Sequence, residues 1–191
     1  MIHLLCMDVI AFFTLLGQIG LLGLLALYVV SKRTTIPFVK QFFFFLQRNG
    51  LWIAFLIAFV STFGSLYLSE ILELPPCTLC WYQRALMYPQ TIILLVAAVR
   101  KHVFVKDYII PLSIIGGMIA SYHYFIQRFP AVAASCGISS ESCTTVYEYY
   151  YGYITIPVMA LTGFVLTALF TILGTRFLNK SEREVNVNES K

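Results

Sequence analysis

The chain has few charged residues. Only 12% of its 191 residues are Asp, Glu, Lys or Arg, whereas 59% are hydrophobic, and its mean hydropathy is +0.81. A soluble globular domain carries about 25% charged residues, so this composition excludes an ordinary soluble protein. It indicates instead a membrane protein that crosses the bilayer several times.

Long polar segments are also lacking. Apolar runs long enough to cross a hydrocarbon core of about 30 Å lie near residues 8–30, 51–69, 82–99, 108–126 and 154–178. The longest segment between two of these runs is 127–153, so no room remains for a soluble domain. The predicted fold class is therefore an all-α integral membrane protein.

Positive charge is unevenly distributed among the connecting segments. Basic residues gather in the segments 31–50, 100–107 and 176–191, whereas the segments 70–81 and 127–153 contain only Arg128 beside four glutamates. By the positive-inside rule the basic segments are cytoplasmic, with the N-terminus outside and the C-terminus in the cytoplasm. The net charge of +4 follows from this asymmetry, so we expect no nucleic-acid partner.

Four of the five cysteines fall in the two segments predicted to be extracytoplasmic. Cys77 and Cys80 precede the third span, and Cys136 and Cys143 lie between the last two. Disulfides persist outside the cytoplasm, so two redox pairs are chemically reasonable there. Cys6, at the outer end of the first span, is expected to be a small packing residue.

The pair Cys77 and Cys80 has the features of a reactive dithiol. It sits at the start of a predicted helix, and Arg84 follows Cys80 by one helical turn. A helix N-terminus and a nearby cation both favour thiolate over thiol. We expect the charge of Arg84 and the helix end to hold the pKa of Cys80 down.

Arg84 and His123 lie at the same predicted depth as Cys80, near the outer surface of the membrane. Polar side chains inside a span face a cavity or a partner, although Arg84 is shallow enough to reach the headgroups. A quinone ring fits such a place, with its tail in lipid and its carbonyl oxygens bound by Arg84 or His123. The competing interpretation of His123 is a hydrogen-bonded packing residue.

Cys136 and Cys143 are separated by six residues of a small, polar segment. We expect this pair to be exposed and to exchange disulfides with a soluble protein. Two alternatives remain open: inert disulfides that brace the outer loops, and a four-cysteine zinc site. Zinc is disfavoured because the second pair lacks the usual two- to four-residue spacing, so no metal is predicted.

Several motifs, in order, resemble the DsbB family of quinone-linked thiol oxidases, and most closely its short BdbC-type branch. The segment 75–84 reads PPCTLCWYQR, and 122–124 reads YHY with Gln127 and Pro130 following. The stretch GYITIP at 152–157 opens the last span. The resemblance covers residues 41–178.

The resemblance implies a four-helix transmembrane bundle at 41–178, followed by a cytoplasmic tail at 179–191. Residues 1–40 add an N-terminal transmembrane helix and a linker that the family core lacks. It also implies a bacterial plasma (inner) membrane, a quinone cofactor (ubiquinone or menaquinone) from the membrane pool, and a DsbA-like partner, which is a thioredoxin-like extracytoplasmic thiol oxidase.

Roles for single residues follow from the same resemblance. Cys77 and Cys80 match the quinone-proximal pair, Arg84 supports quinone use and His123 lies near that site. Cys136 and Cys143 match the shuttle pair, although they lie closer together than in longer-loop members. The predicted function is a thiol:quinone oxidoreductase that passes electrons from Cys136–Cys143 to Cys77–Cys80 and on to quinone. The alternatives are the same machinery run to another end, as a reductase or a one-client oxidase, and a non-enzymatic scaffold with structural disulfides.

Overall fold

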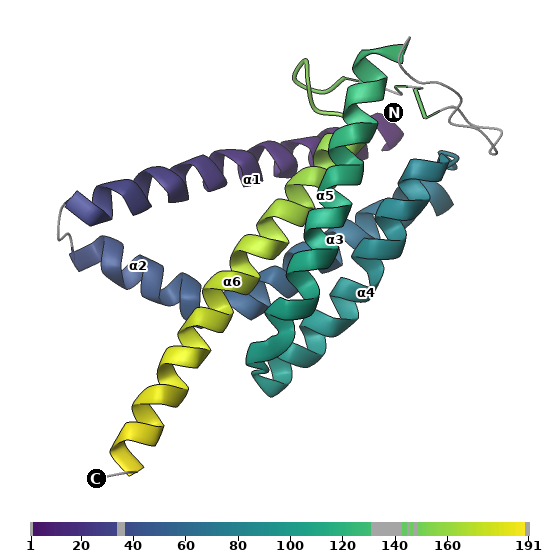
Figure 1. Cartoon of the computed structure of the whole chain (residues 1–191). Helices are drawn as coiled ribbons and strands as arrows, with labels where there is room; N and C mark the ends of the chain where they lie inside the picture. Colours follow the sequence, from purple (N-terminus) through teal and green to yellow (C-terminus); the bar gives the residue numbers. More distant parts are fainter. Residues whose placement is uncertain (1, 34–36, 131–142, 145, 147–148, 190–191) are drawn as a thin grey trace.

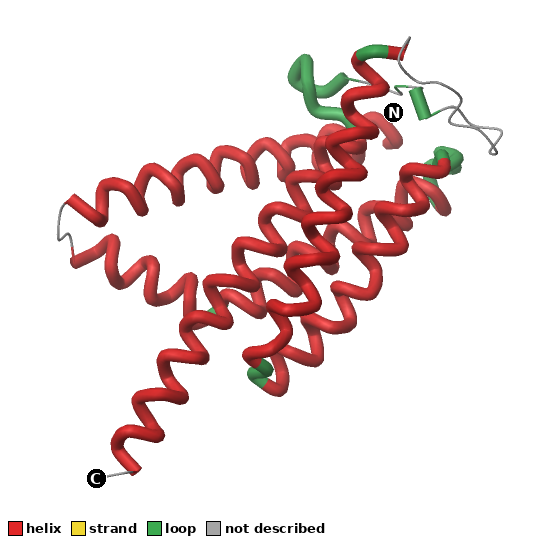
Figure 2. Tube along the Cα trace, viewed as in Figure 1, coloured by secondary structure: helices red, strands yellow, loops and turns green. Residues whose placement is uncertain are grey.

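The computed structural model describes residues 2–33, 37–130, 143–144, 146 and 149–189, and it gives no side-chain account of 2–6, 31–33 and 181–189. These ranges form helices and short connections, with no strand among them (Figure 2). The elements in chain order are α1 (Ile2–Arg33), α2 (Pro37–Arg48), α3 (Gly50–Glu70), α4 (Thr78–Arg100), the 3-10 helix η1 (Val103–Val105), α5 (Lys106–Arg128) and α6 (Ile156–Glu189). The predicted all-α class is confirmed.

Helices α3, α4, α5 and α6 form a bundle in which each helix packs against two neighbours. α4 lies between α3 and α5, and α6 closes the ring against α3 and α5 (Figure 1). α1 and α2 lie to one side, where both contact α6. The predicted four-helix bundle with an extra N-terminal helix is therefore confirmed.

Two close approaches involving glycine allow α6 to pack tightly. A Cβ atom built on Gly50 would lie 2.6 Å from the backbone nitrogen of Gly174, so the start of α3 meets the backbone of α6 directly. The ring of Phe164, 1% exposed, fills the space that a side chain at Gly116 of α5 would need. Small residues at such crossings are how helices pack closely in membranes.

Four helical segments in the described part of the chain are long and apolar enough to cross a membrane. They are Met7–Val30, Gly50–Glu70, Val103–Arg128 and Ile156–Lys180. These segments coincide with four of the five predicted spans, and the protein is a multi-pass membrane protein. The remaining predicted span, 82–99, falls within α4, whose 23 residues reach about 34 Å.

Helix α4 carries polar residues in its middle, and two of them hydrogen-bond to the helices beside it. Thr91 pairs with Thr62 of α3 at 2.9 Å, and Ser113 of α5 donates to Gln90 at 2.9 Å. Interhelical hydrogen bonds offset the cost of polar groups inside a membrane bundle. Thr91 and Gln90 are thus accommodated in the bundle by partners on α3 and α5.

The N-terminal helix is attached to the core by Gln18. Its side-chain amide donates to Thr162 Oγ1 of α6 at 3.0 Å, and its carbonyl oxygen accepts a hydrogen bond from the Tyr153 hydroxyl.

The domain boundary predicted at residue 40 falls within α2, and α6 continues into the predicted tail as far as Glu189. The division into domains stays a prediction.

Candidate redox site

The site lies where α4 begins and α5 ends, and we call this the cysteine end of the bundle. Prolines 75 and 76 separate α3 from α4, since proline has no N–H to continue a helix. Cys77 then adopts an extended conformation at the N-cap of α4, and its carbonyl accepts the Trp81 N–H at 3.1 Å. Cys80 therefore lies in the first turn of α4, next to Cys77.

The two sulfur atoms of this pair are hydrogen-bonded. Cys77 Sγ donates to Cys80 Sγ at 3.5 Å, and Cys77 is 6% exposed whereas Cys80 is half-buried. Both residues precede the predicted span 82–99. The pair is arranged to hold one proton on Cys77 and a thiolate on Cys80.

The hydrogen bond between the sulfurs shifts the two pKa values in opposite directions. It raises the pKa of Cys77 to about 11, with burial as the second cause. The same hydrogen bond is the largest cause of the lowered pKa of Cys80, and burial opposes it. The Cys77 backbone and the charge of Arg84 lower the Cys80 pKa further. The depressed Cys80 pKa was expected from Arg84, but the Cys77 thiol contributes more.

His123 of α5 lies against Cys77, and it is 2% exposed. Its Nε2 is 3.7 Å from Cys77 Sγ, and its Nδ1 is 3.1 Å from the side-chain nitrogen of Gln83 in α4. An amide nitrogen only donates, so Nδ1 accepts and the ring proton of the neutral imidazole is on Nε2. The S–H of Cys77 already donates a hydrogen bond to Cys80, so the Cys77 sulfur accepts a hydrogen bond from the Nε2–H of His123.

Arg84 points toward the opposite neighbour of α4. Its guanidinium donates to the Ser65 carbonyl oxygen of α3 at 3.1 Å and lies 5.5 Å from the centre of the Trp81 ring. The structure thus brings His123 to Cys77 on the α5 side of α4 and Arg84 to Ser65 on the α3 side. Arg84 and His123 were predicted to line one ligand site, but their hydrogen bonds direct them to different neighbours of α4.

Cys143 reaches the first cysteine pair. It is 1% exposed and forms a buried cluster with Cys77 and Ile126, against which Leu79 and Cys80 pack. A side-chain hydrogen bond between Cys143 and Cys77 partly offsets the rise in the Cys77 pKa. The expectation that Cys143 is exposed is wrong, because its side chain packs against the end of α5.

Two other predicted cysteine features fall outside what the structure describes. Cys136 is not among the described residues, and the side chain of Cys6 is not described. The pairing of Cys136 with Cys143 therefore stays a prediction.

The same side chains meet the basic requirement of a metal site. The ligand atoms of Cys77, Cys80 and His123 lie within 4.8 Å of one another, a set of donors that suits zinc. This set differs from the four-cysteine alternative considered for the sequence, because it consists of two cysteines and a histidine. Metal binding and disulfide formation would compete for the same two sulfur atoms.

Gln83 is a site residue to which sequence reasoning gave no role. It is 6% exposed and fixes the tautomer of His123 through Nδ1. The available signal was a glutamine inside an apolar run, three residues after Cys80. Its partner could not be identified without the relative rotation of α4 and α5.

Known proteins match the region of the chain that contains this site. The profile of the family described as "Disulfide bond formation protein DsbB" matches residues 47–174. Over 130 residues, 66% of this chain and 92% of the relative, the chain is 42% identical to "Probable disulfide formation protein C 1" of Bacillus cereus. It is 41% identical to "Disulfide bond formation protein C" of Bacillus subtilis over 64% of this chain and 90% of that one.

A more distant relative extends the match to another bacterium. The chain is 36% identical over 137 residues to "Probable disulfide formation protein" of Coxiella burnetii, covering 71% of this chain and 93% of the relative. No solved structure matches the chain. The matched region contains α3, α4 and α5 with most of α6, and hence both sides of the cysteine end. The chain therefore belongs to the DsbB family of disulfide bond formation proteins.

Proposed function

We propose that the protein is a membrane dithiol:quinone oxidoreductase that reoxidises a DsbA-like, thioredoxin-like thiol oxidase. As a member of the DsbB family it acts in disulfide bond formation. The observation that supports the finer proposal is the contact between Cys143 and Cys77, beside a Cys80 whose pKa is lowered. Cysteines from two separate segments of the chain thereby lie close enough to pass electrons from one to the next.

The first internal transfer is a thiol–disulfide exchange. The partner's dithiol reduces the Cys136–Cys143 disulfide, and the Cys143 thiolate then attacks Cys77 Sγ of an oxidised Cys77–Cys80 pair. A Cys143–Cys77 disulfide forms, the Cys77–Cys80 bond breaks, and Cys80 leaves as a thiolate. Cys80 is the better leaving group because its pKa is the lower of the two.

His123 acts on the second transfer. Cys136 attacks Cys143, and Cys77 is released from the mixed disulfide. Negative charge develops on Cys77 as it leaves, and the Nε2–H of His123, whose nitrogen is 3.7 Å from the sulfur, donates a hydrogen bond that stabilises this charge. Because its pKa in the pair is about 11, Cys77 then takes up a proton from water, which balances the proton that Cys136 loses before it attacks. Gln83 holds His123 in the tautomer whose Nε2–H can donate this hydrogen bond.

The α4 surface around Cys80 fits a quinone headgroup. Cys80 is half-buried beside Trp81 and Tyr82, which are 58% and 55% exposed, and Arg84 supplies a guanidinium next to the Trp81 ring. When bound, a quinone would accept the two electrons of the dithiol. We assign contact with a carbonyl oxygen to Arg84, because His123 is buried and both its nitrogens are engaged.

The proposed orientation puts the cysteine end outside the cytoplasm. The N-terminus lies at this end, and Arg100, Lys101 and Lys106 lie at the opposite end (Figure 1). This distribution agrees with the positive-inside rule if the membrane is the bacterial plasma (inner) membrane.

The proposal is tested by following quinone reduction with a reduced thioredoxin-like partner. Changing Cys77→Ser or Cys80→Ser should abolish turnover of the purified protein, whereas Cys6→Ser should leave it unchanged. Thiol trapping after quinone depletion should find the cysteines of both pairs reduced. Disulfides that stay oxidised, together with no quinone reduction by the unaltered protein, would support the scaffold alternative instead. Undiminished turnover in either serine variant of the Cys77–Cys80 pair would contradict the proposed path.

A further inference from the structure

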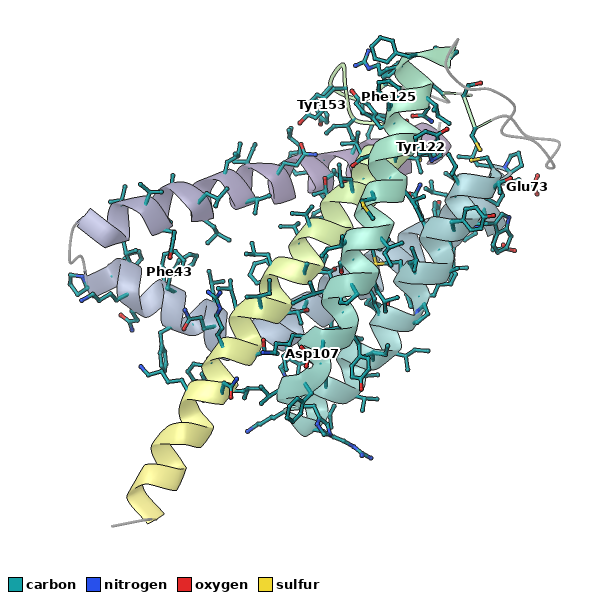
Figure 3. The ribbon with its side chains drawn as sticks, in the orientation of Figure 1. Phe43, Glu73, Asp107, Tyr122, Phe125 and Tyr153 are labelled. Atoms are coloured by element: carbon teal, nitrogen blue, oxygen red, sulfur yellow. The ribbon has the colours of Figure 1, made fainter. Side chains whose placement is uncertain are left out.

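A second polar site lies at the opposite end of the bundle, where α4 ends and α5 begins, and we call this the basic end. A pocket of about 350 Å³ opens there between the α4–α5 connection and α6. Its polar wall contains Arg100, Lys101, His102, Lys106 and Asp107, with Asn179 of α6 opposite. Asp107 marks this end in Figure 3, far from Glu73 and Tyr122 at the cysteine end.

The turn between the helices directs polar groups to the pocket. Lys101 ends α4 in the left-handed conformation (φ 54°), and the His102 N–H returns to the Ala97 carbonyl at 3.2 Å. Val103 and Val105 are 8% and 4% exposed, so the apolar side of η1 is anchored in the core. Lys106 and Asp107 then begin α5, facing the same space as Lys101.

The pocket has an excess of positive charge. Three permanent cations, Arg100, Lys101 and Lys106, stand against one carboxylate, Asp107. None of these three cations has an ion pair within 4 Å among the residues that the structure describes. Cations gathered in one concave place raise the local concentration of anions and hold them by charge-assisted hydrogen bonds.

Exposed apolar side chains border these charges. Phe104 lines the pocket and is 71% exposed, while the adjacent Tyr108 and Val99 are 65% and 63% exposed. In a multi-pass protein, apolar groups at a helix end face acyl chains and aromatic ones face the interface. The pocket therefore opens at the boundary between lipid-facing surface and water, where phospholipid phosphates lie.

We propose that this pocket binds the phosphate headgroup of an anionic phospholipid, with its acyl chains along Phe104 and Val99. Basic pockets between helices on the cytoplasmic side are suited to such headgroups. The site goes beyond the redox function and uses none of its cysteines. A free phosphate would meet the same cations but would gain nothing from the apolar border.

The test is lipid binding to the full-length protein in neutral detergent, measured by native mass spectrometry. The probes are phosphatidylglycerol, phosphatidylcholine and inorganic phosphate. The pocket variant combines Lys101→Gln with Lys106→Gln. The matched control combines Lys40→Gln with Arg48→Gln, which removes the same charge from exposed positions of α2.

We expect one phosphatidylglycerol to bind more tightly than phosphatidylcholine, and the pocket variant to weaken it roughly 20- to 30-fold. The control should bind as the unaltered protein does. Equal loss in both double variants, or no loss in the pocket variant, would overturn the proposal. Inorganic phosphate that binds as tightly as the lipid, and is lost in the pocket variant, would identify a soluble anion site and overturn the lipid assignment.

Discussion

The polar side chains at the two ends of α4 differ in burial and in hydrogen bonding. At the cysteine end, Cys77 and His123 are 6% and 2% exposed, and each is hydrogen-bonded to another side chain of the site. At the basic end, Arg100 and Lys101 are exposed and have no ion pair within the described residues. Buried groups set each other's protonation, whereas exposed cations remain available to an outside ligand.

The middle of α4 connects these two environments. Hydrogen bonds between Thr91 and Thr62 of α3, and from Ser113 of α5 to Gln90, fix the rotation of the helix between its neighbours. That rotation brings Gln83 to His123 and Arg84 to Ser65. Chemistry at the cysteine end therefore depends on packing, while ligand binding at the basic end depends chiefly on net charge.

The largest effect is expected from Cys143. Changing Cys143→Ser should reduce partner-driven quinone reduction to the uncatalysed rate, because the residue in contact with Cys77 is lost. A small dithiol reductant that reaches Cys77–Cys80 directly should still support quinone reduction in this variant. Partner-driven turnover that persists would show that electrons enter without Cys143.

A smaller loss of turnover is expected when the hydrogen bonds of His123 are removed. His123→Ala should slow turnover about 100-fold, because the hydrogen-bond donor that stabilises charge on the leaving Cys77 sulfur is removed. Gln83→Leu should slow it about tenfold, because the tautomer of His123 is no longer fixed. Steady-state kinetics with the partner measures both, and Gln41→Leu at an exposed position of α2 is the control.

A third effect concerns the reactivity of Cys80 alone, measured in protein whose Cys6, Cys136 and Cys143 are serine. Because the Cys80 pKa is lowered, its alkylation by iodoacetamide should proceed at pH values below the usual range for cysteine. Cys77→Ala removes the principal donor and should move the alkylation profile to higher pH. Cys77→Ser keeps an O–H donor and should move it less. Identical profiles in the two variants would mean that the sulfur–sulfur hydrogen bond does not set this pKa.

The smallest effect on the redox reaction is expected at the basic end. Lys101→Gln with Lys106→Gln should leave partner-driven turnover in neutral detergent within about twofold of the unaltered rate. Exposed charges of this kind change stability by less than about 0.5 kcal/mol. The readouts are turnover and the thermal unfolding midpoint. A large loss of turnover would mean that the two ends are coupled.

Much of the fold followed from the sequence. Apolar runs predicted the spans in α1, α3, α5 and α6, and the two prolines with the C-x-x-C pattern placed a dithiol at the start of α4. Such features depend on local composition, which a single sequence reports directly.

The contacts between elements could not be predicted in the same way. The burial of Cys143 depends on its packing against Cys77 and Ile126, and the polar residues around Cys143 in the sequence give no sign of this contact. Arg84 was expected near His123 because both lie at one depth, but depth does not specify which side of a helix a residue faces. The partners of Arg84 and Gln83 follow from the rotation of α4, which the packing of α3 and α5 determines.

The proposed electron transfer from Cys143 to Cys77 is tested by disulfide mapping in the Cys80→Ala variant. With Cys80 absent, the Cys77 thiol should attack the Cys136–Cys143 disulfide at Cys143 and release Cys136. Mass spectrometry of the thiol-blocked protein should then find a Cys77–Cys143 disulfide and a free Cys136. A Cys77–Cys136 disulfide, or an unchanged Cys136–Cys143 disulfide beside a free Cys77, would show that Cys143 is not the residue that exchanges with Cys77.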